Sequence, residues 1–224
     1  MTALRDRQLA ALVPEAGALI VVDVQRSFGD PALLAPYGLD AAAEAAVAAA
    51  VTRCAALVDG ARRRGVPVYW VELGTPADEP WRASAWLRTG NLDAPVGPEE
   101  PCVLGSRGAE WYGVTPLTGE PRIVKRGYSG FVGTDLAERL AADGIEWVAV
   151  AGLTTECCVA ATATDAFQLG WPVLLVDDAT AAYAGDIHRA AVASLALNVA
   201  VVADTAQVEG VWAGRAALVA EVIA

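Results

Sequence analysis

Short apolar runs alternate with helical segments along almost the whole chain, and this alternation limits the fold more than any other feature of the sequence. The first run, 18–24, is continuously apolar, as is typical of a strand buried on both faces of a parallel sheet. Further strands are predicted at 66–73, 122–125, 147–151, 172–176 and 199–202. The chain is therefore predicted to form an α/β fold, a three-layer doubly wound, Rossmann-like sheet of about six parallel strands with helices on both faces.

The segments between these strands are predicted to be helical. The alanine-rich segment 40–64 is the longest, and Gly65 is a residue type that commonly ends a helix. Other helices are expected at about 134–143, 157–169, 186–197 and 206–223. No linker-like segment divides the 224 residues, so 1–224 is predicted to be a single domain.

One connection differs from the rest. The segment 74–121 is rich in Gly and Pro, contains one possible short helix near 81–87, and is too long for an ordinary connection between a strand and the next element. We expect it to be a variable loop that contacts the substrate.

Composition excludes several classes of function. The net charge of −11 argues against nucleic acid and anionic membranes as partners, because binding to phosphates depends on Lys and Arg. No apolar run approaches the roughly 20 residues of a membrane span, and the charged first residues do not resemble a signal peptide. A cytoplasmic location is expected. The four cysteines are too few for a disulfide scaffold in a chain of this size.

The segment 152–159 follows a predicted strand directly, and a helix is expected to begin within it. A cysteine in the first turn of a helix faces unpaired backbone N–H groups and the positive end of the helix dipole, which favour thiolate over thiol. Asp23, Lys125 and Cys158 each lie at or just after the end of a predicted strand. Because ligands bind at the carboxyl ends of parallel strands, we expect these three side chains to converge.

Three segments, 21–28, 124–136 and 152–166, resemble the isochorismatase-like cysteine hydrolases. This superfamily includes nicotinamidases, N-carbamoylsarcosine amidases, ureidoacrylate amidases and isochorismatases. The resemblance implies a catalytic triad in which Asp23 is the base, Lys125 the cation that holds the carboxylate and lowers the thiol pKa, and Cys158 the nucleophile. It also implies a cis peptide before Thr154 and an oxyanion hole formed by the N–H groups of Thr154 and Cys158.

The resemblance further implies hydrolysis of a small amide or ureido (carbamoyl) C–N bond through a thioester. No cofactor is expected: the metal site of nicotinamidases uses histidines after the first strand and around the second, and none occurs there in this chain. An isochorismatase-type vinyl ether hydrolase is an alternative, although such members commonly lack the nucleophilic cysteine. A non-catalytic binding module on the same fold and a thiol-redox protein using Cys157 and Cys158 are two others.

The residues expected to contact the substrate are Gln25, Phe28, Trp70, Trp81, Arg82, Tyr128 and Phe131. Packing would explain Gln25 and Phe28 equally well, and Tyr128 and Phe131 would equally suit a subunit interface. Arg82 or Arg88 could hold a substrate carboxylate, but both also fit a solvated helix face. A homodimer or homotetramer is expected, as is usual in this superfamily.

Two further residues are interpreted as structural. Cys157 is assigned to packing, because only one of two successive helical thiols is expected to face a pocket. His188 is the only histidine of the chain and is interpreted as a surface residue on a helix.

Overall fold

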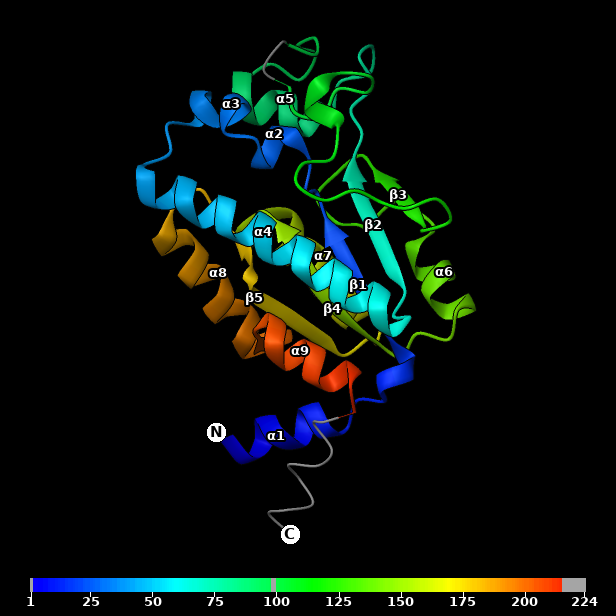
Figure 1. Cartoon of the computed structure of the whole chain (residues 1–224). Helices are drawn as coiled ribbons and strands as arrows, with labels where there is room; N and C mark the ends of the chain where they lie inside the picture. Colours follow the sequence, from blue (N-terminus) through cyan, green and yellow to red (C-terminus); the bar gives the residue numbers. More distant parts are fainter. Residues whose placement is uncertain (1, 98–99, 215–224) are drawn as a thin grey trace.

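The computed structural model describes residues 2–97 and 100–214, and its centre is a six-stranded parallel sheet (Figure 1). The strand order is β3-β2-β1-β4-β5-β6. The strands are β1 (Gly17–Val22), β2 (Val68–Leu73), β3 (Arg122–Lys125), β4 (Trp147–Leu153), β5 (Val173–Ala181) and β6 (Ala200–Ala203). The predicted α/β fold with about six parallel strands is confirmed.

Helices cover both faces of this sheet (Figure 1). One face packs against α4 (Ala41–Arg64) and α9 (Thr205–Trp212), and the other against α6 (Leu136–Ala142), α7 (Ala160–Gln168) and α8 (Gly185–Asn198). The two sides of β1 divide accordingly, because Leu19 and Val21 belong to the first core and Ile20 and Val22 to the second. This is why the strand is apolar at successive positions.

Helix α4 begins and ends as its sequence predicts. The Asp40 side chain accepts a hydrogen bond from the Ala43 backbone N–H at 2.8 Å, and Gly65 ends the helix in a left-handed conformation with φ 69°. The helix has 24 residues and a window of mean hydropathy 1.6, so by length and composition alone it is apolar enough to cross a membrane, a test that core helices also pass. Its apolar residues, among them Val47 and Leu57, pack against the sheet.

Shorter helices gather at the end of the sheet to which β1 and β2 point (Figure 1). They are α2 (Arg26–Gly29), α3 (Pro31–Leu34) and α5 (Arg82–Thr89), with 3₁₀ turns at Ala35–Tyr37 and Arg107–Ala109. Helix α1 (Thr2–Ala10) and a 3₁₀ turn at Pro14–Ala16 precede β1. Of these, only α5 was predicted from the sequence.

Two elements near the end of the chain differ from expectation. Strand β5 does not stop at Val176 but continues to Ala181 through an irregularity in its pairing with β4, which falls between Val150 and Gly152. Such bulges redirect side chains. The last helix, predicted at 206–223, extends in the structure to Trp212, and the part of that prediction beyond residue 214 lies outside the described residues.

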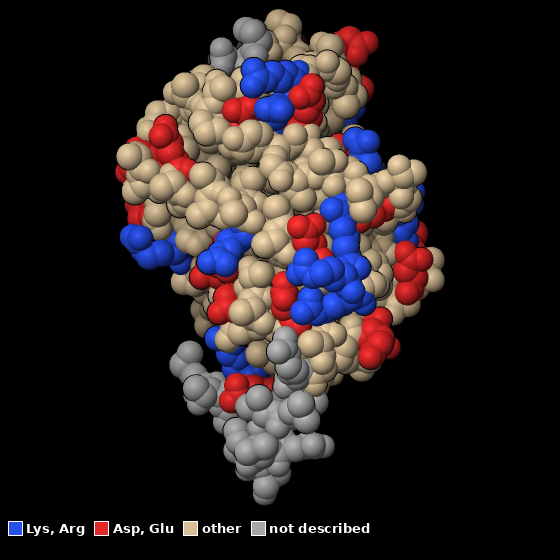
Figure 2. Space-filling model, in the orientation of Figure 1, with Lys and Arg blue, Asp and Glu red and all other residues tan. Residues whose placement is uncertain are grey.

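Charged side chains of opposite sign are mixed on the face shown in Figure 2. At the end of α4, for example, Arg62 pairs with Glu120 at 2.8 Å and Arg64 with Glu209 at 3.2 Å. Basic side chains on this face thus lie beside acidic ones instead of forming the continuous basic surface that polyanions require.

The strand order reverses between β1 and β4, which are neighbours in the sheet. From β1 the chain continues outward to β2 and β3, and from β4 it continues outward to β5 and β6. The crevice beyond the carboxyl ends of two such strands is the usual ligand site of open α/β sheets. The fold therefore directs attention to the residues that follow Val22 and Leu153.

Candidate active site

Three buried side chains meet at this crevice. The Lys125 ammonium Nζ lies 2.7 Å from the Asp23 carboxylate Oδ2 and 3.4 Å from Cys158 Sγ, and it also donates to the Gly127 carbonyl at 2.8 Å. Asp23 and Lys125 are completely inaccessible to solvent, and Cys158 is 5 % exposed. The structure thus brings together the acid, the cation and the thiol that the sequence placed at three strand ends.

Each member is positioned by the strand before it. Asp23 follows β1 with φ 50°, a left-handed conformation that aspartate tolerates better than most residues, and its N–H donates to the Val71 carbonyl at 2.8 Å. Lys125 ends the edge strand β3, where buried and exposed residues alternate, and it shares the buried side with Ile123. The alternation therefore explains how a lysine becomes fully buried.

Cys158 lies in a turn that the sequence did not predict. The Leu153–Thr154 peptide is cis, as the resemblance implied. The next residues form a π-helical turn, Thr155–Val159, which α7 continues from Ala160, so a helix does begin within 152–159 as predicted, but with π instead of α geometry at Cys158. The Thr154 carbonyl accepts the N–H groups of both Cys157 and Val159 at 3.2 Å. Isolated π turns occur frequently at functional sites.

The charges of the three groups depend on one another. Burial raises the pKa of the Asp23 carboxyl above its ordinary value, although Lys125 and the Cys158 thiol oppose that effect. Burial alone would lower the pKa of Lys125, but the Asp23 carboxylate and Cys158 outweigh it and raise the pKa. Lys125 is therefore an ammonium over the whole neutral range.

The pKa of the Cys158 thiol is raised well above its ordinary value by the neighbouring Cys157 thiol, by burial and by the Asp23 carboxylate, and Lys125 only partly offsets them. This direction is opposite to the expected effect of the helix start and the ammonium, which was to favour thiolate over thiol. The sulfur instead needs a base when it attacks, and the carboxylate paired with Lys125 is available for that task.

A pocket of about 220 Å³ opens onto Cys158. Thr154 and Cys158, the two residues proposed to supply the oxyanion hole, both line it, as do Phe28, Trp81 and Tyr128. The Trp81 and Tyr128 rings contact each other edge to face, with centroids 5.0 Å apart. Tyr37, Thr75, Glu156 and Tyr183 also line the pocket, and none of these four was expected from the sequence to contact the substrate.

Cys157 packs against the core on the α6 and α7 side, as its assignment to packing predicted, but it also lines this pocket, which was not expected. It is only partly buried, and its hydrogen bond with Cys158 lowers its pKa. Both thiols are free, as are Cys54 and Cys102. The earlier interpretation assumed α-helical geometry, whereas the two cysteines belong to the π turn.

Two of the predicted substrate contacts are wrong because their side chains are used inside the protein. Trp70 is fully buried in the core on the α4 side of the sheet, where its indole N–H donates to Glu120 at 2.7 Å. Gln25 is 1 % exposed, and its side-chain amide bonds to both the N–H and the carbonyl of Leu73 and to the carbonyl of Ala109. Gln25 thus joins the ends of β1 and β2 to the segment 74–121.

Two others lie away from the pocket for different reasons. Phe131 packs into the core on the α6 and α7 side and stacks on Trp171 with ring centroids 5.9 Å apart. Arg82 points to solvent, with 65 % of its side chain exposed, and lies 3.6 Å from Asp93. Neither residue is among those that line the pocket over Cys158.

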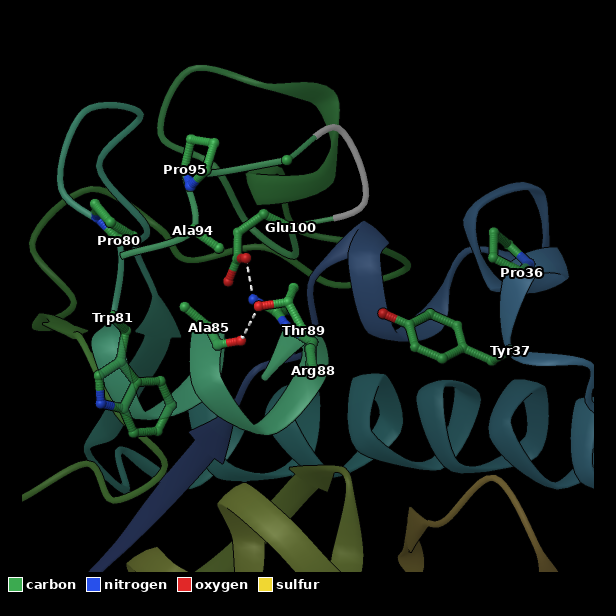
Figure 3. Close-up of a pocket in the computed structure, with 11 residues that line it drawn as sticks. Pro36, Tyr37, Pro80, Trp81, Ala85, Arg88, Thr89, Ala94, Pro95 and Glu100 are labelled. Carbon is green, nitrogen blue, oxygen red and sulfur yellow. Dashed lines mark hydrogen bonds and ion pairs between the residues drawn. The ribbon is translucent and has the colours of Figure 1, made fainter. Parts of the chain in front are cut away.

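Figure 3 shows a second pocket, of about 420 Å³. Tyr37, Trp81, Arg88 and Glu100 line both pockets. Arg88 and Glu100 point toward each other and form an ion pair, while Pro80 and Pro95 line only the second pocket (Figure 3). An arginine of the α5 helix is therefore held where the two pockets meet.

His188 is not an isolated surface residue. Its Nδ1 lies 2.9 Å from Thr155 Oγ1, and its Nε2 lies 3.1 Å from Asp177 Oδ1. Within residues 2–97 and 100–214, no group of three or more His, Cys, Asp or Glu side chains is arranged to hold a metal ion.

A comparison with protein-family models matches residues 17–207 to the isochorismatase domain. The chain belongs to the isochorismatase family. Within this family, the chain is 34 % identical over 214 residues to the ureidoacrylate amidohydrolase RutB of Methylobacterium radiotolerans. The matched region covers 89 % of this chain and 80 % of that relative. The RutB of Caulobacter vibrioides is 29 % identical over 89 % of this chain and 92 % of its own length.

Solved structures agree with this isochorismatase-family assignment. An isochorismatase family protein from Desulfovibrio vulgaris superposes with a TM-score of 0.71 at 28 % identity, covering 89 % of this chain and 99 % of that one. N-carbamoylsarcosine amidase from Thermoplasma acidophilum superposes with a TM-score of 0.67 at 26 % identity, covering 84 % and 96 %. The relatives with named activities are amide-cleaving enzymes, and this chain is a hydrolase of the same superfamily.

Proposed function

We propose that this enzyme hydrolyses the C–N bond of a small amide or ureido compound through a thioester on Cys158. The observation that carries the proposal is the buried contact of Lys125 with both Asp23 and Cys158, beneath a pocket of about 220 Å³. The amidohydrolase and amidase among the relatives support the same bond class.

In the first half of the proposed reaction, Cys158 Sγ attacks the substrate carbonyl carbon and its proton passes to the Asp23 carboxylate. Lys125 remains an ammonium and keeps the two reacting groups together. The carbonyl oxygen becomes an oxyanion, which the N–H groups of Thr154 and Cys158 stabilise; one such donor is typically worth about a hundredfold to a thousandfold in turnover. The C–N bond then breaks, and Asp23 protonates the departing ammonia or amine.

In the second half, a water molecule attacks the thioester carbonyl while Asp23 takes one of its protons. The C–S bond breaks, and the sulfur recovers a proton from Asp23. The products are a carboxylic acid from an amide, or a carbamic acid from a ureido compound, and the free thiol. Asp23 thus acts as base and acid in turn, which suits a carboxyl group whose pKa burial has raised.

The substrate is proposed to carry a carboxylate that Arg88 binds. Lys125 is fully engaged with Asp23, and Arg126, the other cation that lines the pocket, pairs with Glu79 at 3.0 Å toward solvent. Glu100 holds Arg88 where both pockets meet, with 40 % of the arginine side chain exposed. A guanidinium can bind a carboxylate through two parallel hydrogen bonds, so a substrate acid could share Arg88 with Glu100 or replace it.

The reaction is tested by measuring ammonia release from ureido acids, maleamate, biuret, and aliphatic and aromatic primary amides. Wild-type enzyme is expected to release ammonia from at least one, and mass spectrometry of rapidly quenched samples is expected to show an acyl adduct on the peptide that contains Cys158. Cys158→Ala is expected to abolish both signals. Wild-type turnover by that variant would contradict the nucleophile assignment, and no ammonia from any compound would contradict the proposed activity.

Arg88 is tested with a substrate acid and its neutral methyl ester. Arg88→Gln is expected to lower kcat/KM for the acid by about tenfold to a hundredfold, because hydrogen bonds between charged groups are worth roughly 1.5–3 kcal/mol. The value for the ester is expected to change by less than about threefold. An equal loss for both compounds would contradict recognition of the carboxylate by Arg88.

Vinyl ether hydrolysis of the isochorismatase type is the competing reaction, and it needs no acyl adduct. Its signature would be turnover of an enol pyruvyl ether by Cys158→Ala at the wild-type rate. A non-catalytic binding module would instead bind the amides without releasing ammonia.

Assembly and location are further parts of the proposal. We propose that the protein is cytoplasmic and that it forms a homodimer or homotetramer. The assembly is supported by large apolar side chains that are exposed on the single chain. Among them are Leu197, at 82 %, and Phe167, at 49 %, and both line one pocket beside β6. Light scattering of the eluted protein would give the number of subunits, and a monomeric mass would contradict the assembly.

A further inference from the structure

The turn that carries Cys158 is held from outside by a chain of three polar side chains that the proposed mechanism does not use. Thr155, the first residue of the π turn, is fully buried, and its Oγ1 lies 2.9 Å from His188 Nδ1. His188 Nε2 lies 3.1 Å from Asp177 Oδ1. The three residues come from the π turn, α8 and β5, so these hydrogen bonds link three separate elements.

The carboxylate decides which nitrogen of the imidazole carries the proton. A carboxylate only accepts hydrogen bonds, so His188 Nε2–H donates to Asp177. In the neutral ring, Nδ1 then has a free lone pair and accepts the hydroxyl proton of Thr155. The hydroxyl is in this way held in one direction, and the first residue of the π turn is fixed to α8.

The hydrogen bond between Thr155 and His188 matters because Thr155 lies between the two residues whose N–H groups are proposed to bind the oxyanion. It directly follows Thr154, whose N–H is proposed to bind the oxyanion, and it stands three residues before Cys158, which supplies the second N–H. The Thr154 carbonyl accepts two N–H groups of the turn, so a displacement of Thr155 would move both proposed oxyanion donors.

We propose that His188, oriented by Asp177, is a positioning residue that holds the Thr155–Val159 turn in the geometry needed for oxyanion binding. This inference rests on the proposed thioester mechanism. His188 does not line the pocket over Cys158, and it acts through the Thr155 hydroxyl without touching the substrate.

The irregularity in β5 is what makes the arrangement possible. Pairing with β4 places Leu175 opposite Val150 and Thr180 opposite Gly152, so the intervening β5 residues bulge. Asp177 faces His188 from this bulge, whereas Asp178 accepts the N–H and the hydroxyl of Thr205 at 2.8 Å. Successive aspartates thus serve opposite faces of the sheet.

The test compares Thr155→Val, Thr155→Ser, His188→Ala and the double variant Thr155→Val with His188→Ala. Thr155→Val and His188→Ala are each expected to lower kcat by about tenfold to a hundredfold with little change in KM, because small displacements of catalytic groups cost about this much. The double variant is expected to be no slower than the worse single variant. Thr155→Ser keeps the hydroxyl and is expected to stay within about threefold of wild type.

A second readout separates positioning from general damage. Alkylation of Cys158 by iodoacetamide uses the same thiol but forms no oxyanion. Its rate, followed by mass spectrometry of the Cys158 peptide, is expected to change by less than about twofold in Thr155→Val and His188→Ala. Arg189→Ala, on the next residue of α8 and exposed, serves as the matched control and is expected to match wild type in both assays.

Unchanged turnover in Thr155→Val, or alkylation that falls in parallel with turnover, would overturn the positioning role. The Thr155→Val and Thr155→Ser pair keeps the test valid if His188→Ala does not fold. Failure of the proposed function is recognised separately, because it would appear as absent ammonia release by the wild type or as activity of Cys158→Ala.

Discussion

The two sides of the pocket are built in opposite ways. On the sheet side, Asp23 and Lys125 are wholly buried and each is held by the end of a strand. On the side formed by the segment 74–121, the arginine that lines the pocket is partly solvated, with 40 % of the Arg88 side chain exposed. Reactive groups thus stand on the rigid element, and the groups that can meet different substrates stand on the connection.

This difference has an energetic consequence. A buried charge that loses its partner costs several kcal/mol, whereas an exposed ion pair contributes about 0–1 kcal/mol. Substitutions on the sheet side are therefore expected to affect catalysis and folding strongly. Substitutions in the segment 74–121 are expected to change the choice of substrate or to have little effect.

The largest effect is expected for Lys125→Met, which keeps much of the side-chain volume and removes the ammonium. Lys125 lowers the pKa of Asp23, so without the ammonium that pKa rises further and less of the carboxyl is ionised. The base that should take the Cys158 proton is then weakened and has lost its ion-pair partner. We expect kcat/KM to fall by at least about a thousandfold, on the scale of losing a member of a catalytic triad.

Thermal unfolding of Lys125→Met is measured alongside, to distinguish loss of chemistry from loss of fold. The double variant Asp23→Asn with Lys125→Met removes both charges and is expected to be more stable than Lys125→Met alone, yet equally inactive. Substantial activity in either variant would contradict the role of the buried pair.

The second effect concerns stability, at the point where the two central strands meet. Gly152 has φ 122°, and a Cβ built there would lie 2.0 Å from the Val22 carbonyl oxygen. Gly152→Ala must therefore move the backbone of β1 or β4, and we expect a loss of roughly 2–4 kcal/mol, or about thirtyfold to a thousandfold in the folding equilibrium. Denaturant unfolding measures it.

Gly119→Ala in the segment 74–121 is the matched control, because Gly119 also has a positive φ, 95°, but nothing lies within 4 Å of its Cβ position. A loss of about 1 kcal/mol is expected there, from backbone conformation alone. Equal losses at both positions would show that the close approach of the strands is not what makes Gly152 necessary.

The third effect is the pH dependence of kcat/KM. Asp23 accepts a proton in the first step, so the enzyme is active with the carboxylate ionised and loses activity as the pH falls through the Asp23 pKa. Burial raises the pKa of Asp23 above its ordinary value of 3.8, so kcat/KM is expected to begin falling at a pH higher than 3.8. Below the raised pKa, kcat/KM is expected to fall about tenfold for each pH unit. Lys125, with a pKa raised above 10.5, stays charged throughout this range.

Alkylation of Cys158 at different pH values complements the rate profile. The thiol pKa is raised well above 9.0, so alkylation is expected to keep rising with pH beyond 9. A plateau near neutral pH would instead reveal a resting thiolate and would contradict the role of Asp23 as the base.

The sequence was sufficient to predict the sheet side because that side follows from strand ends. Asp23, Lys125 and Cys158 each come after an apolar run, and parallel strands bring their carboxyl ends to one edge. The same rule about strand ends shows why the predicted substrate contact of Trp70 is wrong. Trp70 lies within β2, three residues before its end at Leu73, and an interior strand position belongs to a face of the sheet and not to its edge.

Other features could not be read from local patterns. The link from Asp177 to His188 and Thr155 depends on a bulge in β5 and on a π turn, neither of which has a sequence signature that periodicity detects. Similarly, the fate of the aromatic and basic residues depends on how the segment 74–121 folds back. It brings Trp81 to the pocket and leaves Arg82, the next residue, in solvent.

The smallest effect is therefore expected for Arg82→Ala. The guanidinium lies 3.6 Å from Asp93, but both side chains are largely exposed, at 65 % and 80 %, and neither lines the pocket over Cys158. We expect kcat/KM for a substrate acid and for its neutral ester to stay within about twofold of wild type, because exposed ion pairs contribute little. The contrast with Arg88→Gln, six residues further along the chain, is what makes this variant informative. A tenfold loss for the acid in Arg82→Ala would mean that the segment 74–121 closes over the substrate and brings this arginine to it, so that the exposed side of the pocket is completed only when substrate is bound.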